Sequence, residues 1–226
     1  ELLPAENMKA LGSAGLAQSL QAIHQPDIGT SIGDLLSGRH SAIKRLAFEE
    51  LMAHHLSLRQ KRSAIKSKPA KTIRADSPLQ RGFLDALPFR LTQAQRTVTA
   101  EIQRDMQTGH PMLRLVQGDV GSGKTVVAAM AALSVIAAGG QAALMAPTEL
   151  LAEQHAATFA AWFGPLGIET VFLAGKQTAA MKKKHLARIA DGASMIIGTH
   201  ALMQEHVHYQ DLRLVMVDEQ HRLGVH

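Results

Sequence analysis

The stretch that decides the fold is Gly118-Asp119-Val120-Gly121-Ser122-Gly123-Lys124-Thr125. It has the spacing GxxxxGK[ST], in which glycines let the backbone wrap a phosphate chain with its N–H groups pointing inward. An apolar run, Met112–Gln117, precedes it, and an apolar segment of helical length, Lys124–Ala138, follows. This order predicts a phosphate site at a helix N-terminus. We expect Lys124 to reach the β- and γ-phosphates and the Thr125 hydroxyl to bind Mg²⁺.

Outward from this loop, short apolar runs alternate with segments of helical length. The runs predict strands at Met112–Gln117, Gln141–Ala146, Ile168–Leu173, Ser194–Gly198 and Leu212–Val217. The segments between them predict helices at Lys124–Ala138, Glu149–Phe163 and Thr178–Ala190. Almost continuously apolar strands that alternate with helices are typical of a parallel sheet covered on both faces. The predicted fold class is therefore α/β, with a doubly covered parallel sheet.

Before residue 90 the pattern is helical. Apolar residues recur at helical spacing over Leu16–Ile23 and Arg39–Lys61, which predicts two helices that need a packing partner. Lys66–Asp76 contains Pro69 and has no apolar period, so it is predicted to be a linker or a loop across a surface. Capping patterns then predict helix starts at Ser77-Pro78-Leu79-Gln80 and at Thr92-Gln93-Ala94-Gln95, the second helix ending near Gln107.

Composition excludes several classes of protein. The chain has 226 residues, of which 46% are hydrophobic and 19% charged, close to the globular average. It has no cysteine, which excludes disulfides and thiolate zinc sites and favours a reducing compartment. Its most apolar stretch, Val126–Ala138, is too short to span a membrane. Because the chain opens at Glu1 without a leader, we expect no targeting peptide and a longer parent protein.

Positive charge is concentrated in the helical part. Residues 1–90 hold 13 Lys and Arg against 8 Asp and Glu, whereas residues 91–226 are balanced. A run without any acid lies between Glu50 and Asp76 and contains Arg59, Lys61, Arg62, Lys66, Lys68, Lys71 and Arg74. Such a run is typical either of a nucleic-acid contact or of a solvated linker kept extended by self-repulsion.

A second candidate site lies near the end of the chain. The apolar run Leu214-Val215-Met216-Val217 leads directly into Asp218-Glu219-Gln220-His221. Ligands of open parallel sheets bind at the carboxyl ends of the strands. An Asp there can hold Mg²⁺, and an adjacent carboxylate can orient and deprotonate a water that attacks the γ-phosphate. Lys124, Asp218 and Glu219 are thus the candidate catalytic residues for nucleotide hydrolysis.

Asp218-Glu219-Gln220-His221 resembles the DExH box of superfamily 2 helicases, and its extension to His226 is similar to the RecG family of bacterial DNA branch-migration helicases. Further segments agree with that family in the same order. Leu87–Gln95 looks like its entry to the helicase core, and Leu115–Thr125 resembles motif I. Met145–His155 resembles motif Ia, and Gly198–Leu202 the segment before motif II. Leu223 stands where the family usually has Phe.

The resemblance implies a domain organisation. Residues 88–226 would form the first RecA-like ATP-binding lobe, a P-loop parallel sheet with helices on both faces. Residues 1–87 would form an all-α linker region between a wedge domain and the motor. The implied cofactors are ATP and Mg²⁺. The implied partners are branched DNA, as at forks and Holliday junctions, and the second RecA-like lobe and wedge domain of the same parent, in a bacterial cytoplasm and without a membrane.

The resemblance also implies roles for single residues. Gln95 would lie near the adenine, although the same residue fits a capping box. Gln220 and His221 would couple the state of the nucleotide to the DNA side. The face toward the DNA backbone would be lined by Pro147, Thr148, Gln154, Gly198, Thr199 and His200. In the family, arginines of the second lobe complete the ATP site, so we expect this chain alone to bind MgATP but to hydrolyse it poorly.

Two alternatives stay open at this point. One is the motor lobe of the related transcription-coupled repair DNA translocase, whose motor sequence is similar. The other is a non-catalytic module that binds nucleotide or DNA as a scaffold. Glu219 argues against the scaffold, because a protein that only binds nucleotide has no use for a base beside the metal-binding Asp218.

Overall fold

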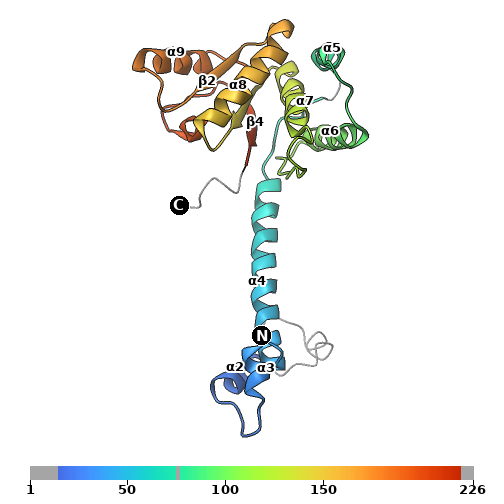
Figure 1. Ribbon diagram of the computed structural model, residues 1–226, viewed down its shortest axis with the longest axis vertical. Helices are drawn as coiled ribbons and strands as arrows, with labels where there is room; N and C mark the ends of the chain where they lie inside the picture. The colour runs from blue at the N-terminus through green and yellow to red at the C-terminus, as the bar shows by residue number, and fades with distance from the viewer. Residues whose placement is uncertain (1–14, 75–76, 220–226) are drawn as a thin grey trace. The chain divides into compact units, whose positions relative to one another are not determined.

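The structure is a computed structural model that describes residues 15–74 and 77–219. The chain divides into two compact units, residues 1–67 and residues 68–226. The first unit is helical, and the second contains all the strands of the described part (Figure 1). Residues 68–87, which the sequence analysis assigned to the linker region, belong to the second unit.

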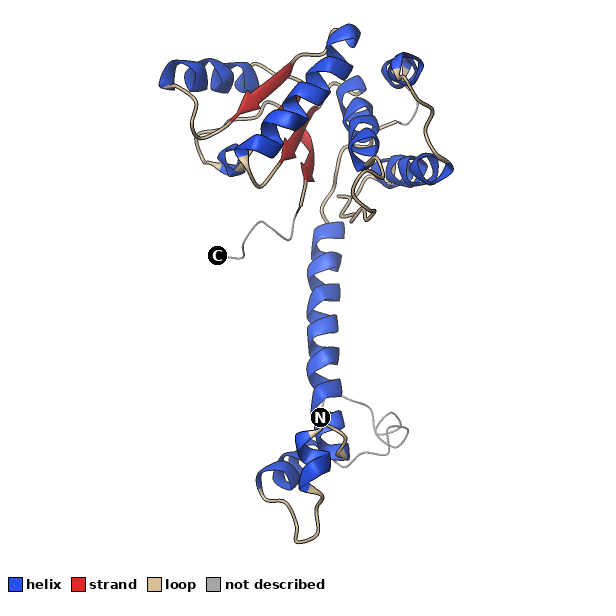
Figure 2. Cartoon of the chain, in the orientation of Figure 1, coloured by secondary structure: helices blue, strands red, loops and turns tan. Residues whose placement is uncertain are grey.

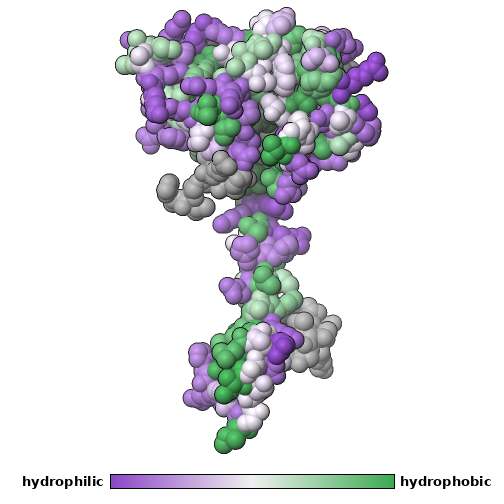
Figure 3. All heavy atoms as spheres, in the orientation of Figure 1, coloured by the Kyte–Doolittle hydropathy of each residue, from purple (hydrophilic) through white to green (hydrophobic). Residues whose placement is uncertain are grey.

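The described residues of the first unit form α2 (Leu16–His24), α3 (Ile32–Leu36) and α4 (Ser41–Lys66). The two helices expected from apolar periodicity are present, whereas the short α3 was not predicted. Helices α2 and α4 pack together, and Arg45 of α4 is buried, with its guanidinium 2.6 Å from the Glu49 carboxylate. Much of the surface of α4 is hydrophilic, with separate hydrophobic spots (Figure 3).

On the apolar side expected for α4, only the side chains near the start of the helix are shielded from solvent. Ile43 and Leu46 are partly buried, but Leu51 and Leu58 are 69% and 44% exposed. The four basic residues of the run that fall on α4 are also exposed, namely Arg59, Lys61, Arg62 and Lys66. These four of the seven basic residues therefore lie on a helix and not in an extended linker.

The second unit is built on a four-stranded parallel sheet in the order β2-β3-β1-β4 (Figure 2). Its strands are β1 (Gln141–Met145), β2 (Thr170–Leu173), β3 (Met195–Gly198) and β4 (Leu212–Val217). The register pairs Met145 with Gly198 on one side and with Val217 on the other. Three strand ends thus meet along one edge of the sheet, and the predicted α/β class is confirmed.

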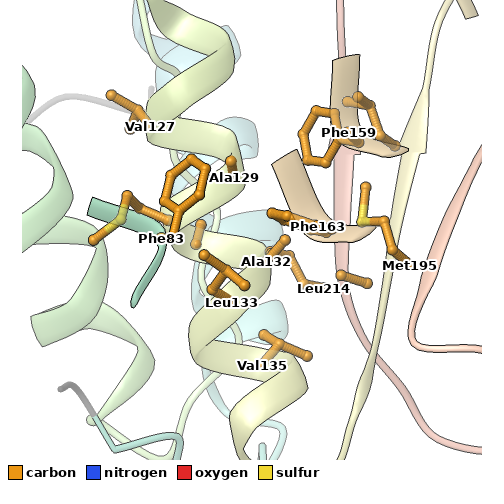
Figure 4. Packing of buried hydrophobic residues seen from close by; sticks show 14 of the residues in the cluster. Phe83, Val127, Ala129, Ala132, Leu133, Val135, Phe159, Phe163, Met195 and Leu214 are labelled. Atoms are coloured by element: carbon orange, nitrogen blue, oxygen red, sulfur yellow. The ribbon is translucent and has the colours of Figure 1, made fainter. Parts of the chain in front are cut away.

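Alternate residues of β1 face the two sides of the sheet. Ala142 and Leu144 join a core with α7 (Lys124–Ala137) and α8 (Glu149–Phe163), as seen in part in Figure 4. Ala143 and Met145 join a second cluster with α9 (Ala179–Ala190) and the 3-10 turn η2 (His200–Met203). Both faces are covered at β1 and β3, whose residues are all buried, whereas Val215 and Val217 of β4 are 56% and 43% exposed.

Two more helices, α5 (Pro78–Ala86) and α6 (Gln93–Met106), pack against α7. Both start at the predicted caps, since the hydroxyls of Ser77 and Thr92 accept hydrogen bonds from the N–H groups of Gln80 and Gln95. Phe83 of α5 is buried against Trp162 and Phe163 at the end of α8. The caps fixed where these helices begin, and the aromatic contacts hold α5 on the core.

The prediction of a strand at Met112–Gln117 is wrong. The segment makes no ladder with any strand of the described residues, and Leu113 and Leu115 are 73% and 71% exposed. Arg114 instead joins the segment to α6 through Glu101 and Asp105, at 2.7 and 2.8 Å. A strand requires hydrogen bonds to a neighbour, and β4 ends the sheet without bonding to this segment. Its apolar composition alone could not supply that partner.

Strand β2 is also shorter than expected, because it begins at Thr170 and not at Ile168. The Ile168 N–H donates instead to the carbonyl oxygen of Phe163, at 3.1 Å, and so closes the turn after α8. That turn contains η1 (Gly164–Leu166). Local turn closure therefore takes the first residues of the apolar run out of the sheet.

Residues 68–74 form a strap across the second unit. The N–H groups of Ala70 and Ile73 donate to the carbonyl oxygens of Gly109 and Met106, and Ile73 is buried. Of the two interpretations of Lys66–Asp76, the loop across a surface is therefore confirmed for the strap.

None of the helices in the described residues combines the length and the apolar composition that a membrane-spanning helix needs.

Candidate nucleotide-binding site

The phosphate loop, residues 118–123, leads directly into α7. The N-cap of α7 is Gly123, which offers no side-chain hydrogen bond to the first N–H groups of the helix. Four other helices of this unit have such a bond, from Ser77, Thr92, Thr148 and Thr178. The Val126 N–H donates to the Gly123 carbonyl oxygen, and no side chain caps the N–H groups of Lys124 and Thr125 before it. The partial positive charge of this helix end favours an anion there.

The glycines of the loop are required by its shape. Gly121 and Gly123 have φ values of 82° and 80°, in the left-handed region that other residues adopt with strain. A Cβ on Gly123 would collide with the Gln95 amide, and one on Gly118 would lie 2.6 Å from the Ser122 hydroxyl. Other residues at Gly121 and Gly123 would strain the backbone, and a Cβ at Gly118 or Gly123 would push the Ser122 or Gln95 side chain aside.

Lys124 lies over this cradle. Its ammonium donates to the carbonyl oxygens of Gly118 and Asp119, at 2.7 and 3.0 Å. The hydrogen bonds fold the side chain back over the loop, so a positive charge is held where the phosphate chain is expected. Thr125 follows on the first turn of α7, where its half-buried side chain can join a metal ion bound to the phosphates.

Gln95 connects α6 to the phosphate loop. Its carbonyl oxygen accepts from the Thr92 N–H at 2.9 Å and completes the predicted capping box. Its amide group donates to the carbonyl oxygen of Ser122, also at 2.9 Å. The capping interpretation of Gln95 is confirmed, and the same side chain additionally braces the loop. Its role near an adenine stays a prediction.

The acidic residues lie at the end of β4. The Asp218 N–H donates to the Met145 carbonyl oxygen at 2.9 Å, which anchors its backbone to β1. One carboxylate oxygen of Asp218 accepts from the Glu219 N–H at 3.0 Å, and the other lies 2.7 Å from Nε2 of His155. Glu219 has a φ of 50°, a left-handed conformation that is uncommon outside glycine. Gln220 and His221 lie outside the described residues.

The connection between α7 and β1 places the two halves of the site at the same edge. Helix α7 packs against β1 and β4, and only residues 138–140 join its end to the start of β1. Three residues span about 10 Å, whereas α7 is about 20 Å long, so α7 runs opposite to β1. Its first turn therefore lies toward the carboxyl ends of the parallel strands, where Asp218 also lies.

The residues expected to face DNA follow the neighbouring strands β1 and β3. The Ala146 N–H donates to the Gly198 carbonyl oxygen at 2.9 Å, so the loops after these two strands begin side by side. Thr148 caps α8, and Thr199, which is buried, caps η2. Gln154 and His200 have exposed side chains, whereas Pro147 is partly buried and Gly198 is buried.

One residue at the site, His155, was not among the residues predicted from the sequence. His155 was part of the segment that resembles motif Ia but received no role, and the structure brings it to Asp218, 63 residues away in the sequence. The one-turn spacing of three and four residues on α8 could show that His155 shares a side with Ala152 and Phe159, which are buried. No local pattern could show what stands opposite that side.

The fold and this site define a RecA-like P-loop lobe, with a glycine cradle and an acidic strand end at one edge of a parallel sheet. The family model of DEAD/DEAH box helicases matches residues 92–226. The chain belongs to the DEAD/DEAH box helicase family.

Relatives within this family are RecG helicases. The ATP-dependent DNA helicase RecG of Escherichia coli (strain K12) is 52% identical over 227 residues, which cover 100% of this chain and 32% of that protein. RecG of Haemophilus influenzae is 49% identical, over 93% of this chain and 31% of its own. A solved structure of RecG bound to a three-way DNA junction matches with a TM-score of 0.81 and 37% identity, covering 100% of this chain and 30% of that one. The chain thus spans about a third of these relatives.

Proposed function

We propose that this chain is the helical linker and first motor lobe of a RecG-type ATP-dependent DNA helicase, which remodels forks and Holliday junctions in bacterial DNA repair and recombination. The observation that carries the proposal is the pairing of the phosphate loop with Asp218 and Glu219 at one edge of the sheet. The similarity to RecG helicases supports it over the whole length of the chain.

The residues at this edge fit MgATP. A Cβ at Gly118 or Gly123 would collide with the Ser122 or Gln95 side chain, and the helix behind the loop lacks a side-chain cap. Lys124 would move from the loop carbonyls to the β- and γ-phosphates, and Thr125 and Asp218 would hold Mg²⁺. Bound Mg²⁺ neutralises charge that develops on the phosphates. Glu219 would orient a water and accept its proton.

Weak turnover by the isolated chain is part of the proposal. An arginine supplied from another domain can be worth about 10³–10⁵ in turnover in related nucleotidases. The resemblance assigns such arginines to a second lobe. This chain alone would therefore bind MgATP and turn it over slowly.

The proposed DNA face comprises the loops that follow β1 and β3. Thr148, Gln154 and His200 are its members with exposed side chains, so they are the ones that can reach a DNA backbone directly. The hydroxyls of Thr148 and Thr199 each accept a cap hydrogen bond, from the N–H groups of Leu151 and Ala201, and so hold the backbone of these loops. Their proposed contribution is to set the shape of the loops.

The first test is a binding titration with a fluorescent ATP analogue and Mg²⁺, combined with ATP turnover in the presence and absence of forked DNA. We expect the wild-type chain to bind the nucleotide and Lys124→Ala to lose that binding while it keeps its circular dichroism spectrum. Turnover should be negligible even with DNA. A wild-type chain that binds no nucleotide would overturn the proposal.

Turnover decides the part of the proposal that concerns the second lobe. Robust hydrolysis that Lys124→Ala abolishes would contradict the need for another lobe and would indicate that copies of this chain complete the site for one another. A sedimentation experiment at the same protein concentration would then show self-association.

A further inference from the structure

The contact between His155 and Asp218 joins α8 to the end of β4. Nε2 of His155 lies 2.7 Å from one oxygen of the Asp218 carboxylate. The two side chains are only 17% and 28% exposed, so water competes weakly for this contact. An ionised carboxylate only accepts hydrogen bonds, and therefore Nε2 of His155 is the donor.

Packing sets the position of the histidine. Ala152 and Phe159 lie three residues before and four residues after His155, on the same side of α8, and both are completely buried. Thr148 caps the start of the helix with its hydroxyl, which accepts from the Leu151 N–H at 3.3 Å. The ring thus projects from a segment of helix that is fixed on both sides.

Asp218 is held at three points, two of which are on its carboxylate. Its backbone is bonded to Met145, one of its oxygens accepts from the Glu219 N–H, and the other accepts from His155. A carboxylate offers about four lone-pair sites, so two remain for a metal ion after these two bonds. Groups that hydrogen-bond to a metal-binding carboxylate fix its direction before the metal arrives.

We infer that His155 is a positioning residue that orients the Asp218 carboxylate for Mg²⁺. The inference rests on the proposed function, since it assigns a role in the same MgATP site. His155 itself touches neither nucleotide nor metal in this role. Its loss should raise the Mg²⁺ concentration that nucleotide binding requires, and it should leave the metal-free contacts of the phosphate loop unchanged.

Three variants of the chain test this. His155→Leu introduces an apolar side chain of similar size and removes the N–H donor. His155→Gln retains an N–H donor on a side chain of comparable reach. His185→Leu is the matched control, because His185 is half-buried on α9 and its hydrogen bond is to Gln177. The readout is the Mg²⁺ midpoint for binding of a fluorescent ATP analogue, with affinity in EDTA and thermal melting measured alongside.

We expect His155→Leu to raise the Mg²⁺ midpoint about 10–100-fold, the range for groups that support metal ligands. His155→Gln should restore most of the wild-type midpoint, and His185→Leu should match the wild type. The affinity in EDTA should be equal in all four proteins. Rescue by glutamine is the result that a merely structural histidine would not produce.

An unchanged midpoint in His155→Leu would overturn the inference, as would equal impairment of the leucine and glutamine variants. An equal loss of affinity in EDTA would also overturn it, because the defect would then lie in the phosphate loop. These results leave the proposed function standing, since the wild type still binds the nucleotide. A wild-type chain without nucleotide binding would overturn both.

Discussion

The Lys71 ammonium lies 2.9 Å from the carboxylate of Asp211, which is 140 residues further along the chain. Arg213 donates to the same carboxylate oxygen from two nitrogens, at 2.6 and 3.0 Å, and also reaches the Ala138 carbonyl oxygen at 2.8 Å. Asp211 therefore joins the strap of residues 68–74 to Arg213 at the start of β4, and Arg213 in turn contacts the turn after α7.

This arrangement predicts a dependence of stability on pH. Hydrogen bonds from Arg213 and Lys71 lower the pKa of Asp211 to about 2. A carboxyl group whose folded pKa is depressed stabilises the fold above its unfolded pKa, and this contribution is lost as the pH falls through the folded pKa. We expect Asp211→Asn to melt below the wild type near neutral pH, and the gap in Tm to shrink below about pH 4.

Thermal melts of both proteins at a series of pH values, followed by circular dichroism, measure this gap. Lys71→Met is a second comparison, because it removes one donor and leaves Arg213 in place. A gap for Asp211→Asn that stays constant into the acid range would show that the carboxylate charge does not contribute.

A buried polar contact between α5 and α7 predicts a larger loss of stability. Gln80 is almost fully buried, and its amide donates to the Ser134 hydroxyl at 2.7 Å and to the Met130 carbonyl oxygen at 3.0 Å. Gln80→Ala should lower the free energy of unfolding by about 1–3 kcal/mol, because buried acceptors lose their donor. Ser134→Ala removes one of the two acceptors and should cost less. Urea denaturation measures the free energy of unfolding of each protein. Equal values for Gln80→Ala and the wild type would contradict the prediction.

The aromatic core predicts the largest effect on folding. Phe163 is completely buried, with its ring centroid 5.2 Å from that of Phe159 and 6.1 Å from that of Phe83. Phe163→Ala should destabilise the chain by about 3–5 kcal/mol through the cavity it leaves. Leu150→Ala, on the same helix but 65% exposed, is the control and should change little. Denaturant midpoints compare the two, and similar losses in both would refute the packing argument.

Two glycines of the phosphate loop predict different outcomes for the same substitution. Gly121 and Gly123 both have a left-handed φ, but a Cβ on Gly121 meets no heavy atom within 4 Å, whereas one on Gly123 collides with the Gln95 amide. Both alanine variants carry backbone strain of about 1–2 kcal/mol. Only Gly123→Ala also displaces Gln95 from Ser122, so we expect it to lose more nucleotide affinity than Gly121→Ala. Equal affinities would show that the brace from Gln95 does not matter.

Local signals allowed much of the fold to be predicted. The segment of helical length between two apolar runs predicted α8 with its observed ends, Glu149–Phe163. The run Leu212–Val217 was likewise a strand over its whole length. The phosphate loop was recognisable because its glycines, lysine and threonine act within eight consecutive residues. In each case the determining interactions lie within a few residues of one another.

Distant interactions account for what the sequence did not show. Met112–Gln117 has the composition of a strand, but strand formation needs a bonded neighbour, and Arg114 holds the segment to α6 instead. The contacts of His155 with Asp218, Gln80 with Ser134 and Lys71 with Asp211 each join residues more than 50 positions apart. The chain's local patterns thus predicted the fold class, which the structure confirms, and the candidate phosphate loop and acidic pair, whereas only the folded arrangement of helices on the sheet decided which side chains contact them.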